Sequence, residues 1–142
     1  CMNGRAIGIG AAVGIGGSML LGVLFQLFPF DGEKHPLWAI LAISYASGAL
    51  VDIAAGATAG WLAARRGALH GLLAGLISGL VSPLLGFAMM WVRERGAVPI
   101  EFVPYLFAVS SGVALGVLVA AISGAISGAV AARVVAKQAG QG

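Results

Sequence analysis

Residues 48–83, GALVDIAAGATAGWLAARRGALHGLLAGLISGLVSP, contain two apolar segments separated by the short basic sequence Arg65-Arg66-Gly67. Both segments are rich in glycine and alanine and belong to apolar runs of ~20 residues or more, the length that crosses ~30 Å of hydrocarbon as a helix. The basic sequence between them leaves room only for a tight turn. This stretch therefore predicts two membrane-spanning helices that fold back on each other.

The composition of the whole chain points to a lipid bilayer. Of its 142 residues, 60% are hydrophobic and 9% are charged, and the mean hydropathy is +1.02. Soluble domains of this length are far more polar. We expect an all-α polytopic membrane protein, a single membrane domain over residues 1–142. Its four spans are predicted at about residues 6–28, 37–63, 69–91 and 102–135.

The charged residues divide unequally between the two sides of the membrane that these spans create. The side that carries both termini has five cations and no acid: Arg5, Arg65, Arg66, Arg133 and Lys137. The opposite side mixes three cations with four acids. Because Lys and Arg accumulate in cytoplasmic loops, we expect both termini in the cytoplasm and the protein in the cytoplasmic (inner) membrane. The net charge of +3 then reports topology, and no nucleic-acid partner is expected.

An internal repeat becomes visible when residues 48–65 are aligned with residues 116–133. GALVDIAAGATAGWLAAR and GVLVAAISGAISGAVAAR share nine of 18 positions, including a pair of glycines four residues apart and the closing Ala-Ala-Arg. Each copy is the second helix of one half of the chain. We therefore expect two tandem helical hairpins in the same orientation, a parallel repeat.

Small residues recur at every fourth position of the predicted helices. In a bilayer this spacing lets two helix backbones approach closely, which offsets the ~1 kcal/mol that glycine costs against alanine in a helix. In the first helix, Gly8, Ala12 and Gly16 form one such series. The glycines that we expect to mediate helix packing are Gly10, Gly14, Gly56, Gly60, Gly71, Gly75, Gly79, Gly124 and Gly128.

Around the central turn, GATAGWLAARRGALHGLLAGLI resembles a local pattern of small four-helix, glycine-rich membrane proteins of bacteria and archaea. The shared elements are pairs of small residues, a doubly basic turn and the sequence Gly-x-x-His-Gly, and the resemblance covers residues 56–80. Those proteins have no assigned activity. The resemblance thus implies a four-helix membrane fold and implies no chemistry.

Asp52 is the one acid inside a predicted span. An ionised carboxylate there costs ~2.5–3.5 kcal/mol, which makes the residue a candidate functional site. Counting from the turn places Ser78 and Ser82 at the same depth, and Pro83 removes the helical partner of the Gly79 carbonyl. These oxygens can form a cation or proton site. The alternative is a protonated Asp52 that hydrogen-bonds the second helix to the third as a structural lock.

The other polar residues have plainer interpretations. His70 has no second His, Cys or acid at ligand spacing, so we expect an interfacial histidine and no metal site. Arg65 and Arg66 mark topology or bind anionic lipid head groups. The sequence contains no nucleophile–base pair, zinc pattern or phosphate loop, so an enzyme, a catalytic residue and a cofactor are not expected.

Cys1 directly precedes Met2 and is the single cysteine. Its simplest interpretation is a residue added before the start methionine. The alternative is a lipid-modified cysteine left by signal-peptide cleavage. That alternative would place the N-terminus outside, against the distribution of charge.

The sequence thus predicts a small non-catalytic structural or accessory subunit. Its glycine-lined faces would pack against copies of itself or against larger membrane partners. The alternative, from a different functional class, is a small ion- or proton-coupled transporter or channel with Asp52 as the titrating group. The repeat places Ala120 where Asp52 would recur, so the second hairpin offers no matching site.

Overall fold

The computed structural model of the protein describes residues 2–27, 36–63, 66–93 and 102–140. These residues form four helices, α1 (Gly4–Leu27), α2 (Leu37–Ala63), α3 (Gly67–Arg93) and α4 (Phe102–Ala139). Each helix includes a segment of 19 residues or more that is apolar enough to cross a membrane. For these residues the prediction of an all-α structure with four helices long and apolar enough to span a membrane is confirmed, as in a multi-pass membrane protein.

The observed helices differ from the predicted ones at their ends. α1 begins at Gly4, two residues before the predicted start, because Asn3 caps it: the Asn3 Oδ1 accepts a hydrogen bond from the Ala6 amide over 3.2 Å. α4 extends four residues beyond its predicted end, to Ala139. Its 38 residues correspond to ~57 Å, well over the ~30 Å of the hydrocarbon core, so part of α4 lies outside it.

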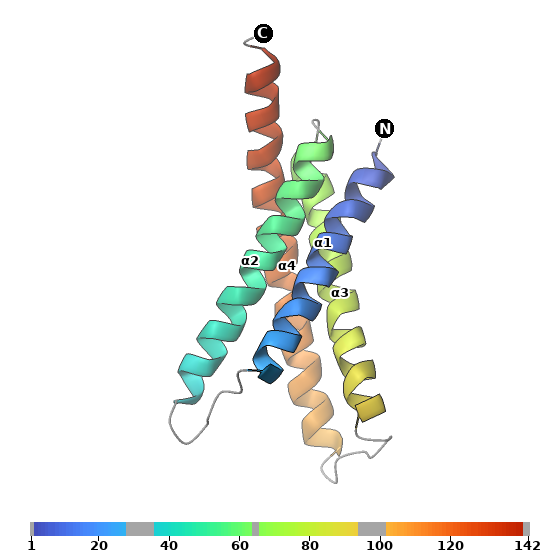
Figure 1. Cartoon of the computed structure of the whole chain (residues 1–142), viewed down its shortest axis with the longest axis vertical. Coiled ribbons are helices and arrows are strands. Elements are labelled where there is room, and N and C mark those ends of the chain that lie inside the picture. Colours follow the sequence, from blue (N-terminus) through green and yellow to red (C-terminus); the bar gives the residue numbers. More distant parts are fainter. Residues whose placement is uncertain (1, 28–35, 64–65, 94–101, 141–142) are drawn as a thin grey trace.

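α2 and α3 contact each other and diverge toward the end of the bundle opposite the termini (Figure 1). α1 contacts both of them on one side, and α4 contacts both on the other. Within the described residues, α1 and α4 do not contact each other. Successive helices run in opposite directions, so the described parts of both termini lie at the same end of the bundle.

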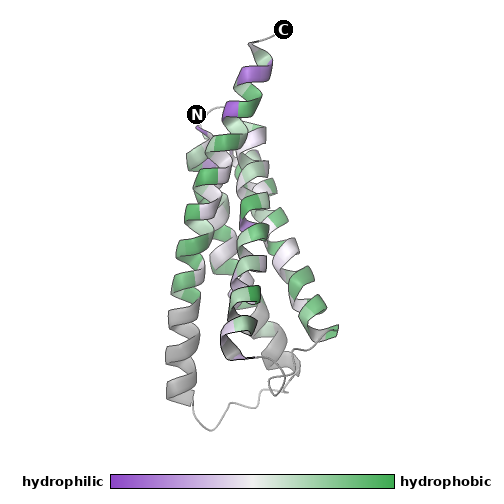
Figure 2. Ribbon diagram, turned by 90° about the vertical axis from the view of Figure 1, so that its left-hand side faces the viewer, coloured by the Kyte–Doolittle hydropathy of each residue, from purple (hydrophilic) through white to green (hydrophobic). Residues whose placement is uncertain are grey.

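Small residues line the interior, and large apolar side chains face outward. The buried apolar residues in the described part of the chain are eight alanines and Ile7. Leu20, Leu50 and Leu118 are each more than half exposed. Among the residues that Figure 2 colours by hydropathy, most of the strongly hydrophilic ones lie toward the end that carries the termini. This distribution is the reverse of a water-soluble protein and suits lipid, where helices associate by close packing and not by burial of large side chains.

α4 packs against its two neighbours through direct contacts between glycines. A Cβ added at Gly60 would overlap the carbonyl oxygen of Gly128, and one at Gly71 would overlap the carbonyl oxygen of Gly124. Gly56 meets Gly124 in the same way. Backbone atoms of α4 therefore rest on backbone atoms of α2 and α3, and only hydrogen fits at these positions.

α1 occupies the groove between α2 and α3 on the opposite side. A Cβ added at Gly10 would lie 2.7 Å from both the Ala55 carbonyl oxygen and the Ala59 Cβ. One added at Gly17 would lie 2.7 Å from the Val51 Cγ1. Glycine at these two positions therefore lets α1 pack closely against α2.

The turn between α2 and α3 uses glycine for close approach and not for its backbone freedom. Arg66 has a φ of 54°, the left-handed conformation that costs an L-residue roughly 1–2 kcal/mol. The glycine stands next to it, at Gly67, where an added Cβ would overlap the Gly128 carbonyl oxygen of α4. Contact with α4 therefore requires glycine at residue 67. Arg66 adopts the left-handed conformation despite its energetic cost.

Substitution of Gly71 tests the backbone contact between α3 and α4. We expect Gly71→Ala to lower the free energy of unfolding by about 1–3 kcal/mol, because the added methyl must push the helices apart. The measurement is unfolding in mixed micelles of rising dodecyl sulfate content. Gly116→Ala is the matched control on α4, since a Cβ there meets no atom within 4 Å. Equal effects of the two substitutions would contradict the contact.

Candidate functional site

Asp52 and Ser78 connect α2 to α3 inside the bundle. The Ser78 Oγ lies 3.2 Å from the Asp52 Oδ1. Ser78 is 1% exposed, and Asp52 is half-buried. On the α1 side, a Cβ added at Gly14 would lie 2.6 Å from the Ser78 Cβ and 2.9 Å from its Oγ. α1 therefore covers Ser78, and it can do so because residue 14 is glycine.

The Ser78 hydroxyl faces two acceptors but carries one proton. Its Oγ lies 3.1 Å from the Gly75 carbonyl oxygen as well as 3.2 Å from Asp52. With Asp52 ionised, the proton serves only one of these acceptors at a time. With Asp52 protonated, the carboxyl donates to Ser78 and Ser78 donates to Gly75, so every group is bonded. The contact is thus compatible with a structural lock and sensitive to the protonation state of Asp52.

The two other members of the predicted cation site are not bonded to Asp52. Gly79 faces α4, where an added Cβ would lie 3.1 Å from the Ala120 Cβ. The Ser82 Oγ is buried and has no hydrogen-bond partner among the residues that the structure describes. α3 continues through Pro83 without interruption. The arrangement therefore joins one carboxyl and one hydroxyl, with a second, unsatisfied hydroxyl one helical turn away.

His70 lies in a polar contact that ties the start of α1 to the start of α3. It is 2% exposed. Its Nε2 accepts a hydrogen bond from the Asn3 backbone amide over 3.0 Å, and its Nδ1 lies 3.0 Å from the Arg66 carbonyl oxygen. These partners require a neutral ring with the proton on Nδ1, since one nitrogen must accept and the other must donate. His70 is therefore a structural link between helices and not simply an interfacial residue.

Sequence reasoning identified His70 but missed its partner Asn3. An asparagine just before an apolar helix is a recognisable capping signal. Its contact with a histidine 67 positions later could not be read from spacing, because it depends on how α1 packs against α3. In the described part of the chain, no group of three His, Cys, Asp or Glu side chains could hold a metal ion.

The remaining predicted residues are the packing glycines and the two arginines of the turn. Every glycine predicted to mediate packing would bring an added Cβ within 4 Å of another helix. In contrast, a Cβ at Gly8 or Gly16 would meet no atom within 4 Å. Arg66 is exposed at the turn, and Arg65 lies outside the described residues. The glycine faces that were expected to bind other subunits are thus largely covered within the chain, except on the outer side of α1.

No protein-family model, curated protein or solved structure matches the chain. The resemblance of residues 56–80 to small four-helix membrane proteins remains a matter of sequence pattern. The functional proposals therefore rest on the contacts described above.

Substitution of His70 tests its role as a link. We expect His70→Leu to cost about 0.5–1.5 kcal/mol of stability, because the part-buried hydrogen bond from the Asn3 amide loses its acceptor. Amide hydrogen exchange should accelerate over the first turns of α1. Asn3→Ala is the comparison: it removes the capping oxygen but keeps the backbone amide, and should cost about 1 kcal/mol. Unchanged exchange in His70→Leu would contradict the link.

Proposed function

We propose that the protein is a non-catalytic structural or accessory membrane subunit that associates through the outer face of α1. The observation that supports this role is the series Gly8, Ala12 and Gly16, spaced by four residues and exposed. No atom of the other described helices lies within 4 Å of a Cβ added at Gly8 or Gly16. The partner is a copy of the same chain or a larger membrane subunit.

The cost of glycine in a helix makes this face informative. Each glycine costs ~1 kcal/mol against alanine, and at Gly56, Gly60 and Gly71 close helix packing offsets that cost. At Gly8 and Gly16 no other described helix provides such packing. Exposed larger side chains, including Ile9, Val13 and Leu20, border the series. A small-residue series between larger neighbours matches the shape of a transmembrane helix interface.

The proposal extends to the arrangement of the chain in its membrane. Two tandem hairpins related by a parallel repeat are supported by the contacts of Gly56 with Gly124 and of Gly60 with Gly128, because each pair occupies equivalent repeat positions. A cytoplasmic membrane location with both termini inside is supported by the cations at the end that carries the termini. The resemblance to small four-helix membrane proteins agrees with this arrangement.

A second candidate function, a proton- or ion-coupled transporter or channel, is favoured by the contacts of Asp52. The carboxyl shares Ser78 with the Gly75 carbonyl oxygen, and protonation of Asp52 decides which bonds form. The unsatisfied Ser82 hydroxyl, one turn further along α3, offers a further oxygen ligand. The structural role ranks first because the contact is satisfied when Asp52 is neutral.

Substitution of Asp52 separates the two candidates. For a structural lock, Asp52→Asn keeps a donor toward Ser78 and should leave stability unchanged, whereas Asp52→Ala should cost about 0.6 kcal/mol, the average for an interhelical hydrogen bond in a membrane. Proton flux into proteoliposomes that contain a pH-sensitive dye should be equal for the wild type and Asp52→Asn. Wild-type flux that disappears in a stably folded Asp52→Asn would favour the transporter.

Native mass spectrometry of the gently extracted protein tests the proposed association. We expect a homo-oligomer or a hetero-complex that Gly16→Ile dissociates, because the larger side chain fills the interface on α1. Gly116→Ile is the matched control, since Gly116 also faces open space but on α4. A wild type that is monomeric in mild detergent and in vesicles would overturn the proposal.

A further inference from the structure

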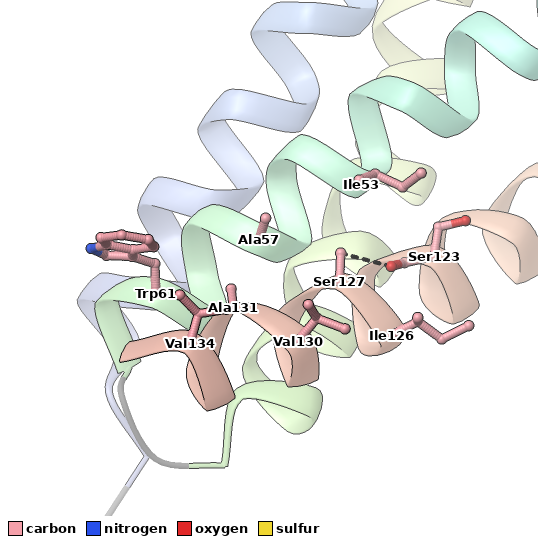
Figure 3. A pocket seen from close by; sticks show the side chains of 9 residues that line it. All are labelled: Ile53, Ala57, Trp61, Ser123, Ile126, Ser127, Val130, Ala131 and Val134. Atoms are coloured by element: carbon pink, nitrogen blue, oxygen red, sulfur yellow. Dashed lines mark hydrogen bonds between the residues drawn. The ribbon is translucent and has the colours of Figure 1, made fainter. Parts of the chain in front are cut away.

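α2 and α4 form an open apolar groove beside their line of contact (Figure 3). Its larger lining side chains are Ile53 and Trp61 of α2 and Ile126, Val130 and Val134 of α4. The cavity volume is about 580 Å³, within the ~300–1,000 Å³ of typical small-molecule sites. The five side chains are all exposed, so the groove opens on the outer surface of the bundle.

The close glycine contacts explain why the groove exists. Because the backbones of α2 and α4 touch, the large side chains beside the contact line diverge, and Ala57 and Ala131 leave the space between them unfilled. Two serines of α4, Ser123 and Ser127, are the polar residues that line the groove. The Ser127 hydroxyl donates to the Ser123 carbonyl oxygen over 2.7 Å and is thus bonded within α4. The other seven lining residues are apolar, so the groove suits an apolar occupant.

One end of the groove reaches the membrane boundary. Trp61 lies in the last turn of α2, where the candidate span ends. At the adjacent turn, an added Cβ on Gly67 would overlap the Ala132 Cβ of α4, so α4 residues beyond Ala132 pass the level of that turn (Figure 1). Lys137 therefore stands ~7–8 Å beyond it, which matches the ~5–7 Å depth of a head-group layer.

Two cations of α4 flank this end of the groove. At ~100° per residue, Lys137 projects between the directions of Ile126 and Val130, and Arg133 projects next to Ile126. Both cations are exposed. The described residues at this level include no acid to neutralise them. An apolar groove that leads to two exposed cations is complementary in charge and polarity to a phospholipid with an anionic head group.

We propose that the groove binds one acyl chain of an anionic phospholipid, whose phosphate contacts Lys137 and Arg133. Trp61 lies where the chain meets the head group, the level that tryptophan favours in membranes. Each cation near the membrane surface strengthens association with an anionic lipid roughly fivefold. The site is separate from the outer face of α1 that the proposed association uses.

A second copy of the chain fits this groove less well. Two copies related by a two-fold axis would bring the same cations together, and like charges across an interface are unfavourable. A single acyl chain with an anionic head group does not meet this obstacle.

Fluorescence quenching of Trp61 tests the site. The protein has three tryptophans, so Trp38→Phe with Trp91→Phe leaves Trp61 as the sole reporter. This variant is placed in phosphatidylcholine vesicles that contain a small fraction of either phosphatidylglycerol or phosphatidylcholine brominated near the head group. We expect apparent association of the brominated phosphatidylglycerol to be at least roughly fivefold stronger, and to weaken as salt is added.

Charge variants show whether the preference belongs to the groove. Neutralising Lys137 and Arg133 to Gln should abolish the preference for phosphatidylglycerol. Arg5→Gln removes a cation at the same end of the bundle but on α1, and should leave the preference intact. Equal quenching by the two lipids, or equal loss in Arg5→Gln, would overturn the site. Protection of Trp61 from both lipids together with cross-linked dimers would assign the groove to a second copy and would also overturn it.

Discussion

The approach of the α4 backbone to α2 and α3 is the constraint on which the rest of the structure depends. The carbonyl oxygens of Gly124 and Gly128 lie where side chains of α2 and α3 would otherwise stand. With no side chains at these crossings, backbone atoms fix the distance between helices, and many weak dispersion contacts form along each crossing. Larger side chains are excluded from the crossings and face lipid. The groove beside Trp61 and the strained turn at Arg66 follow from the same approach.

The four spans could be predicted because a bilayer demands long apolar runs, and such runs are visible in composition alone. The sequence could not show which helix contacts each helix face. Gly56 and Gly60 have the same spacing whether they meet a helix of the same chain or of another chain, and only the structure shows that Gly124 and Gly128 cover them. The outer series on α1 has an identical sequence signature but has no neighbour within the described chain.

The sequence predicted how deep the residues of the candidate site lie along their helices, but not the directions in which their side chains point. Asp52 and Ser78 leave a common turn on two helices with the same rise per residue, so counting from the turn places them at one level, and their side chains are in contact. Counting says nothing about rotation around the helix axis. Gly79 is only one position from Ser78, yet it turns by ~100° and faces α4. The contact between Asn3 and His70 depends on the packing of α1 against α3, which no local pattern encodes.

The order of the helices along the chain, with α4 after α2 and α3, has a consequence for biosynthesis. During translation, α2 and α3 enter the membrane while the helix that covers Gly56, Gly60 and Gly71 is still being made. Until α4 is inserted, the backbone of α2 and α3 at these glycines is exposed to the surrounding lipid. The bundle of these four helices is therefore completed only after α2 and α3 have entered the membrane.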